Sequence, residues 1–171
     1  VDFVWAEKLM DGGGELAFQP KESATRIHLL KALYRMAGSP APSRPASALP
    51  FTDVPRSAGY QTALRWAWEQ GLVGGYDETT FAGPANVTRQ QLAVMLWRYD
   101  RMGGGDAAAA GDLSAFADGA EVSGWAAEAV SWAVGRGLLT GRSGGLLEPK
   151  GYTTRAEAAQ LLMRYLEGQN G

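Results

Sequence analysis

The chain has 171 residues, with 46% hydrophobic and 20% charged residues and a formal net charge of −2. A composition of this kind is typical of a globular protein, and the length is sufficient to bury a core. The net charge does not indicate nucleic-acid binding. Because the chain has no cysteine, disulfides, cysteine zinc ligands and cysteine nucleophiles are excluded. No run of about 18 apolar residues occurs, so we expect no insertion into a membrane.

A Thr-Arg pair that precedes a helical pattern occurs three times in the chain. The pairs are separated by 63 and then by 66 residues, and they are Thr25-Arg26, Thr88-Arg89 and Thr154-Arg155. Self-similarity at a nearly constant period is the signature of a repeat architecture. Three copies of one small site favour a binding module that gains from multivalency over a single catalytic centre.

The repeat extends well beyond this pair. Phe51 and Phe116 open the second and third copies with an offset of 65 residues, and from Trp66 and Trp132 onward the offset is 66. The first copy matches only from its middle and lacks the opening Phe-x-Asp part. Because the chain begins with Val1 rather than Met, we expect a first copy that is cut at its N-terminus. The resulting division is motif one (1–37, partial), a linker (38–50), motif two (51–102), a second linker (103–115) and motif three (116–168).

In chain order, motif one contributes a helix that starts at Thr25, and the Pro-rich first linker follows. Apolar residues of motif two then recur at the spacing of one helical face, at Tyr60, Ala63, Leu64, Ala67 and Trp68. Gly71 is the expected cap at the end of this helix, and a second helix starts at Thr88. Motif three repeats this order with Gly137 and Thr154. No segment alternates apolar and polar residues, so the predicted fold class is all-α. Each helix–loop–helix motif is too small to bury its own face, and we expect the three to pack together.

The Thr of each pair is typical of a helix N-cap. Thr154 and Glu157 have the spacing of a capping box, in which the hydroxyl and the carboxylate each satisfy a free backbone N–H group. Thr88 can do the same with Gln91, whereas we expect His28 to cap the helix of motif one poorly. A purely structural interpretation, in which the pair only starts a helix, accounts for the Thr residues but not for the Arg residues.

An Arg in the first turn of a helix lies at the positive end of the helix dipole, which is unfavourable by about 0.3–1 kcal/mol. Arg26, Arg89 and Arg155 therefore need a compensating anion. One alternative is a protein carboxylate, for which Asp53 and Asp118 are the candidates. The other is a bound carboxylate or phosphate, which a free helix N-terminus and a guanidinium can hold together. The residues alone leave both alternatives open.

Aromatic residues provide a second line of evidence. Trp66 and Trp132 share one repeat position and are predicted to be core residues. Trp97 precedes Arg98 on its helix and is expected to be more exposed. Tyr76 follows two glycines in a loop, where an aromatic ring can stack on a sugar. The candidate ligand-binding residues are therefore Arg26, Arg89, Arg155, Tyr76 and Trp97.

Motifs two and three share an ordered set of short sequence patterns. In motif two these are Phe51-x-Asp53-Val54, Gly71-Leu72, Gly75-Tyr76-Asp77, Phe81 and Val87-Thr88-Arg89. In motif three they are Phe116-x-Asp118, Trp125-Ala126, Gly137-Leu138, Gly141 and Thr154-Arg155-Ala156-Glu157. This set resembles the S-layer homology motif, and the match covers nearly the whole chain outside the linkers. The resemblance implies a pseudo-threefold unit of three motifs around a central helical bundle.

The resemblance also implies a function, which is the non-covalent anchoring of a surface protein to the cell wall of a Gram-positive-type bacterium. The location would then be extracellular. The ligand would be a secondary cell wall polysaccharide, often with pyruvylated amino sugars, that is bound in grooves between adjacent motifs. The Arg of the Thr-Arg-Ala-Glu sequence would bind the acidic sugar, because a pyruvyl ketal carries a carboxylate. Motif three alone has this complete sequence, so we do not assume that all three motifs bind ligand. No cofactor or metal is implied.

Two other classes of function remain as alternatives. The repeats could serve protein–protein contacts in a surface lattice, including self-association. A hydrolase is disfavoured, because glycosidases need a pair of carboxylates that flank the scissile bond, and no such pair recurs among the repeats. The chain also has a single His. We therefore expect no enzyme activity in this chain.

Overall fold

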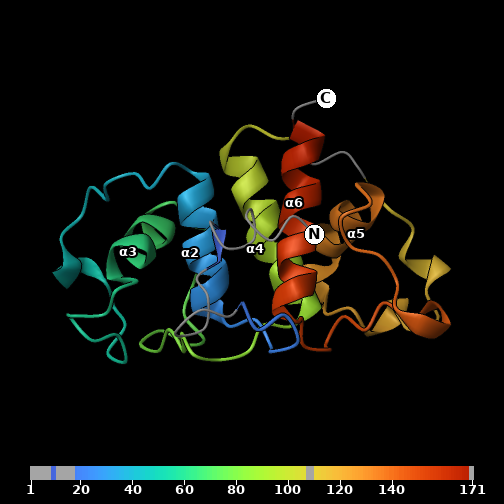
Figure 1. Cartoon of the computed structure of the whole chain (residues 1–171), viewed down its shortest axis with the longest axis horizontal. Helices are drawn as coiled ribbons and strands as arrows, with labels where there is room; N and C mark the ends of the chain where they lie inside the picture. Colours follow the sequence, from blue (N-terminus) through green and yellow to red (C-terminus); the bar gives the residue numbers. More distant parts are fainter. Residues whose placement is uncertain (1–8, 11–17, 107–109, 170–171) are drawn as a thin grey trace. The chain divides into compact units, whose positions relative to one another are not determined.

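The computed structural model describes residues 9–10, 18–106 and 110–169. Within these ranges the chain forms α-helices and short 3-10 turns, and no β-strand is present. The α-helices are α2 (Arg26–Met36), α3 (Gln61–Glu69), α4 (Arg89–Met102), α5 (Ala127–Gly135) and α6 (Arg155–Gln169) (Figure 1). The predicted all-α class is thereby confirmed. The part of the chain that is described contains no helix that is both long enough and apolar enough to cross a membrane.

The chain divides into two compact units. Unit one contains α2 and α3 and comprises Val1–Gln19 and Ala24–Asn86, whereas unit two contains α4, α5 and α6 and comprises Pro20–Ser23 and Val87–Gly171. The three-motif boundaries and the pseudo-threefold arrangement stay predictions.

In unit one, α3 packs against α2. The face of α2 that is buried carries Leu29, Leu30 and Leu33, at the spacing of one side of a helix. Trp66 on α3 is 5% exposed, and its ring centroid lies 5.5 Å from that of Tyr34. The predicted helix around Tyr60–Trp68 and the predicted core position of Trp66 are both confirmed.

In unit two, α5 packs against α4. Trp132 on α5 is 1% exposed, and its ring lies 6.5 Å from the ring of Tyr165 on α6. Tyr165 also meets Tyr99 of α4 edge-on, at 6.0 Å. Since aromatic rings bury a large apolar area, these contacts make Trp132 the centre of the unit-two core, as its repeat position predicts.

Glycines end the first helix of each complete motif as expected. Gly71 and Gly137 follow α3 and α5 with φ values of +68° and +66°. In this left-handed conformation the chain turns back, so that the N–H of Leu72 donates to the carbonyl of Ala67 at 2.8 Å and that of Leu138 donates to Ala133 at 2.9 Å.

Three isolated β-bridges involve the residues that start the helices. Thr25 pairs with Asn86 in unit one, and Thr88 pairs with Tyr152 in unit two. Thr154 pairs with Ser23, which also belongs to unit two. In terms of sequence, these pairings join motif one to two, two to three, and three to one. Each Thr that starts a helix of a Thr-Arg pair is therefore bridged to a residue that lies two positions before the corresponding Thr of another motif.

The opening of motif three is packed too closely to accept a side chain at Gly119. A Cβ atom there would lie 1.9 Å from the carbonyl oxygen of Leu113. We expect Gly119→Ala to lower the free energy of unfolding by about 1–3 kcal/mol, because the backbone must shift to relieve the overlap. Gly124→Ala is the matched control, since a Cβ at Gly124 meets nothing within 4 Å. Urea unfolding of both variants measures the difference, and equal midpoints would contradict the close contact.

Candidate ligand-binding groove

Capping boxes start the helices that follow the Thr-Arg pairs. The hydroxyl of Thr88 accepts from the N–H of Gln91, and the Gln91 side chain accepts from the N–H of Thr88. Thr154 and Glu157 make the same two bonds, at 2.8 and 3.2 Å. The expectation that His28 caps poorly is wrong. Its Nδ1 accepts from the N–H of Thr25 at 3.1 Å, because an unprotonated ring nitrogen is an acceptor just as a carboxylate oxygen is.

The remaining N–H groups of these first turns are also occupied. The N–H groups of Arg26 and Ile27 donate to the carbonyls of Ala85 and Gly83. The N–H groups of Arg89 and Gln90 donate to Gly151 and Pro149, and those of Arg155 and Ala156 donate to Glu22 and Pro20. All of the donors that a helix start normally leaves free are therefore satisfied. A bound anion would have to be held by side chains and not by these backbone groups.

The guanidinium groups find partners that the sequence did not suggest. Arg26 donates from Nε to the carbonyl of Phe81 at 2.9 Å and from Nη2 to that of Gly74 at 2.6 Å. Arg89 repeats the pattern with the carbonyls of Leu147, at 2.8 Å, and Thr140. The partners that offset the dipole are thus backbone oxygens of the loop of the following motif. From the sequence we considered a protein carboxylate or a bound anion as the partner of these Arg residues, and we did not consider backbone carbonyls.

Asp53 and Asp118, which share one repeat position, bind the N–H groups of the same two loops. Asp53 accepts from the N–H groups of Phe81 and Ala82, both at 2.8 Å. Asp118 accepts from those of Leu147 and Glu148, both at 2.7 Å. Among the described ion pairs, neither Asp contacts an Arg of the Thr-Arg pairs. The proposed direct Arg–Asp staple is therefore replaced by an indirect one, in which Asp holds the N–H groups and Arg the carbonyl groups of one loop.

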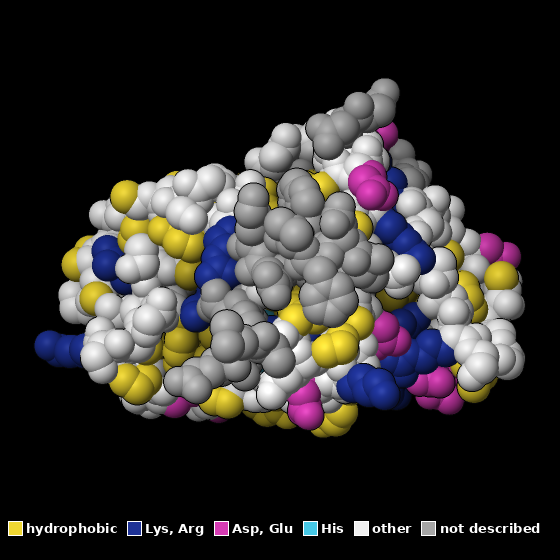
Figure 2. Space-filling model, viewed as in Figure 1, with side chains coloured by type: hydrophobic (Ala, Val, Ile, Leu, Met, Phe, Trp, Pro, Cys, Tyr) yellow, Lys and Arg dark blue, Asp and Glu magenta, His cyan; other side chains and the backbone are white. Residues whose placement is uncertain are grey.

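A small cavity opens beside Arg89 in unit two. It has a volume of about 100 Å³, and α4, α6 and the loop between α5 and α6 supply its walls. We call it the Arg89 groove. Three Arg side chains and a single carboxylate are among its polar lining residues, which are Arg89, Arg142, Arg164, Glu157, Gln160, Thr140 and Thr153. Figure 2 shows Lys/Arg and Asp/Glu side chains intermixed over the loop between α5 and α6. The Arg89 groove therefore carries an excess of positive charge.

Within the Arg89 groove, Glu157 lies between two of the cations. Arg142 donates from Nε and Nη2 to its two carboxylate oxygens at 2.9 and 2.8 Å, and from Nη1 to Glu148. The Nη1 of Arg89 is 3.8 Å from Glu157 Oε1. The described part of the chain supplies no hydrogen bond or ion pair to Arg164, which is half-buried. Arg164 thus lines the groove without a described protein partner, and its guanidinium donors are available to a ligand.

The pKa values follow from this crowding. Burial acts to raise the pKa of Glu157, but hydrogen bonds from the Thr154 N–H and Arg142 outweigh it and hold the pKa below its ordinary value. Burial lowers the pKa of Arg89, and the charge of Arg142 lowers it further, while Glu157 partly compensates. Burial would also lower the pKa of Arg142, but Glu148 and Glu157 raise it. Glu157 is therefore ionised at neutral pH and separates two cations that repel each other.

The other candidate residues lie apart from this cavity. Tyr76 is 74% exposed and belongs to the loop of unit one that Arg26 contacts at Gly74. Trp97 is partly buried on α4, with the Arg101 guanidinium 4.7 Å from its ring centroid, and does not line the Arg89 groove. Arg155 is 1% exposed. The structure thus places Tyr76 on the loop that Arg26 contacts at Gly74 and leaves Trp97 outside the Arg89 groove.

Sequence reasoning missed three residues of this region. Arg142 and Arg164 line the Arg89 groove, and Tyr152, which is 58% exposed, accepts from Arg142 through its carbonyl at 2.9 Å. Tyr152 lies two residues before Thr154, so its closeness to the repeated pair was a usable signal. No comparable indication existed for Arg142 and Arg164, because neither belongs to a sequence pattern that the motifs share.

The chain belongs to the S-layer homology domain family. The family model matches residues 50–93 and 115–159, which is just over half of the chain and covers motifs two and three. Domains of this family mediate anchoring to the cell wall, and the relatives of this chain include proteins of the cell surface.

Three relatives illustrate the range of proteins that carry the domain. The chain is 25% identical over 152 residues to a cellulosome-anchoring protein of Acetivibrio thermocellus, which is 88% of this chain and 33% of that protein. It is 32% identical over 120 residues to a surface-layer 125 kDa protein of Lysinibacillus sphaericus, 68% of this chain and 10% of that protein. It is 24% identical over 171 residues to exoglucanase XynX of Acetivibrio thermocellus, 99% of this chain and 15% of that enzyme. The chain thus spans a third or less of the length of these relatives.

Proposed function

We propose that this domain fixes a surface protein to the cell wall by binding an anionic secondary cell wall polysaccharide, and that the Arg89 groove is a binding site for its acidic sugars. The observation that carries the proposal is the excess of Arg side chains in a cavity at a Thr-Arg helix start, in a family of wall-anchoring domains. The names of the surface-layer and cellulosome-anchoring relatives support the same role.

The chemistry of the groove assigns a different task to each cation. A carboxylate is gripped best by two parallel N–H groups of one guanidinium, and Arg164 has these donors available. Arg142 is already bidentate on Glu157, so it contributes mainly positive potential. Arg89 uses Nε and Nη2 on the loop carbonyls and meets the ligand through Nη1. A pyruvylated sugar carries a carboxylate of the kind that this arrangement takes.

The other predicted residues fit the proposal as parts of equivalent sites. Arg26 with Tyr76 forms the counterpart in unit one, where the exposed ring stacks on a sugar face. Arg155 is the first residue of α6, the helix that follows the third Thr-Arg pair. Trp97 remains a candidate for polymer contact outside the Arg89 groove. Domains of this family are non-catalytic anchoring modules, and the enzymes among the relatives match through their surface-anchoring region. We therefore infer that this chain has no catalytic activity of its own.

The decisive variant is Arg164→Gln, which removes a guanidinium that has no described partner. We expect its binding to purified cell walls to fall about tenfold, since a charge-assisted hydrogen bond contributes about 1.5–3 kcal/mol. The measurement is a pelleting assay with walls before and after chemical removal of the secondary polymer. The parent should lose its binding to stripped walls.

Arg44→Gln is the matched control for loss of one positive charge. Arg44 is exposed in the first linker and does not line the Arg89 groove. Its guanidinium lies over the ring of Trp68, which is not a candidate ligand-binding residue. It should bind walls as the parent does. If Arg164→Gln and the parent bind equally, the Arg89 groove is not the site. If stripping leaves binding unchanged, the partner is peptidoglycan or protein, as the alternative of an assembly module requires.

A further inference from the structure

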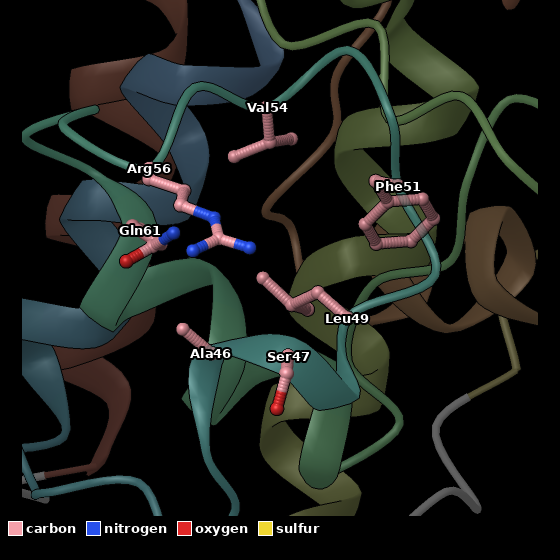
Figure 3. A pocket seen from close by; sticks show the side chains of 7 residues that line it. All are labelled: Ala46, Ser47, Leu49, Phe51, Val54, Arg56 and Gln61. Atoms are coloured by element: carbon pink, nitrogen blue, oxygen red, sulfur yellow. The ribbon is translucent and has the colours of Figure 1, made fainter.

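A second and larger pocket lies in unit one, away from the Thr-Arg helix starts. Its volume is about 550 Å³, within the range of small-molecule sites in proteins. The first linker, the opening loop of motif two and the first residue of α3 line it, with Ala46, Ser47, Leu49, Phe51, Val54, Arg56 and Gln61. Figure 3 shows the Arg56 guanidinium reaching into the space between Val54, Leu49 and Gln61. The cation thus shares the pocket with four apolar and two neutral polar side chains.

The two complete motifs differ at a position that lines this pocket. The offset of 65 residues places Val54 of motif two at the position of Gly119 in motif three. In motif three the linker packs directly on this position, with Leu113 O so close that no Cβ fits at Gly119. Val54 has a Cβ, so the linker of motif two cannot approach in the same way. At this position motif three has a linker carbonyl in close contact, whereas motif two has a side chain that lines a pocket.

The charges at this position are also opposite in the two motifs. Motif two has Arg56 where motif three has Glu121, and Thr62 where motif three has Glu128. No acidic residue lies in the first turn of α3, and its N-cap residue Tyr60 makes no side-chain cap, whereas Glu128 lies in the first turn of α5. Motif three thus supplies its own negative charge at its helix start, and motif two does not.

Arg56 has no counter-ion among the residues that the structure describes. It takes part in no hydrogen bond or ion pair within the described residues. An Arg that is unpaired beside a helix start without acidic residues creates a positive potential, and the pocket concentrates it next to apolar side chains. A ligand that matches this surface has one carboxylate for Arg56 and an apolar face for Leu49, Val54 and Phe51. Ser47 and Gln61 can then hydrogen-bond to hydroxyl groups.

We propose that this pocket is a binding site for a small organic carboxylate of the size of a sugar acid. The site is built by Val54 and Arg56 and belongs to motif two, so it is distinct from the Arg89 groove and does not depend on the function proposed for that groove. The guanidinium grips the carboxylate through two parallel N–H···O bonds, and the linker residues cover the rest of the ligand.

The test is a titration with glucuronate, followed by NMR of the backbone amides of the full chain, with glucose as the uncharged control. Glucuronate should produce saturable shifts at Ser47, Val54 and Gln61, and glucose should not. Arg56→Gln should weaken the affinity at least about tenfold. Val54→Gly, which copies motif three and keeps Arg56, should also weaken it because the linker can then close.

Arg164→Gln separates this site from the Arg89 groove. It should leave the glucuronate shifts at Val54 unchanged, even if it abolishes wall binding. Arg56 lies on an exposed loop, so its substitution is not expected to affect folding, and unchanged amide spectra without ligand verify this. Shifts that persist in Arg56→Gln, equal shifts with glucose, or no saturable shift across the millimolar range would each overturn the proposal.

Discussion

Replacing Trp132 by Ala is expected to lower the free energy of unfolding by about 3–5 kcal/mol, the usual cost of truncating a large aromatic residue in a core. Trp132 is 1% exposed, and its ring lies against that of Tyr165. The Arg136 guanidinium lies 5.8 Å from the same ring. Removing the indole leaves a cavity at the point where α5 meets the rest of unit two, and the surrounding helices can relax into it only in part.

Urea unfolding followed by far-UV circular dichroism measures this loss. The matched control is Trp125→Ala, seven residues earlier in the same unit, whose side chain is 62% exposed. Its effect should stay within about 0.5 kcal/mol, as is usual for surface substitutions. Should the two variants unfold at the same urea concentration, Trp132 would not be the centre of the core.

The core and the helix ends were largely readable from the sequence. Helical spacing placed Trp66 and Trp132 inside because burial of a repeated apolar face leaves a periodic signal. Gly71 and Gly137 were readable for a similar reason, since only glycine adopts positive φ without strain. Features that each depend on one residue type at a fixed position are therefore recoverable without coordinates.

The binding region was recovered less completely, because the partners of Arg26 and Arg89 are backbone carbonyls. Every residue has a carbonyl, so the choice of acceptor leaves no trace in residue identity. The pocket at Arg56 likewise depends on packing. Val54 lines this pocket, whereas a linker carbonyl lies close against Gly119, the equivalent position of motif three. Both features arise from tertiary packing and could not be read from spacing alone.

The Arg89→Ala variant is expected to lower the free energy of unfolding by about 3 kcal/mol. Arg89 is 5% exposed, and it donates to the carbonyls of Leu147 and Thr140, which would lose their partner. Hydrogen bonds from a charged donor contribute about 1.5–3 kcal/mol each, and two on one side chain do not add fully. Arg26→Ala should cost less, because Arg26 is only half-buried and water can reach its acceptors.

Urea unfolding of Arg89→Ala beside Arg101→Ala, from the exposed end of the same helix, tests this expectation. The result also decides how binding data are to be interpreted. If Arg89→Ala is destabilised as expected, its loss of wall binding reports the collapse of the loop that forms the Arg89 groove as well as any direct contact with ligand. If Arg89→Ala keeps full stability and still fails to bind, Arg89 acts on the ligand and its carbonyl contacts are dispensable. Only Arg164→Gln separates these effects in the first case, because Arg164 can be removed without leaving any described protein group unpaired.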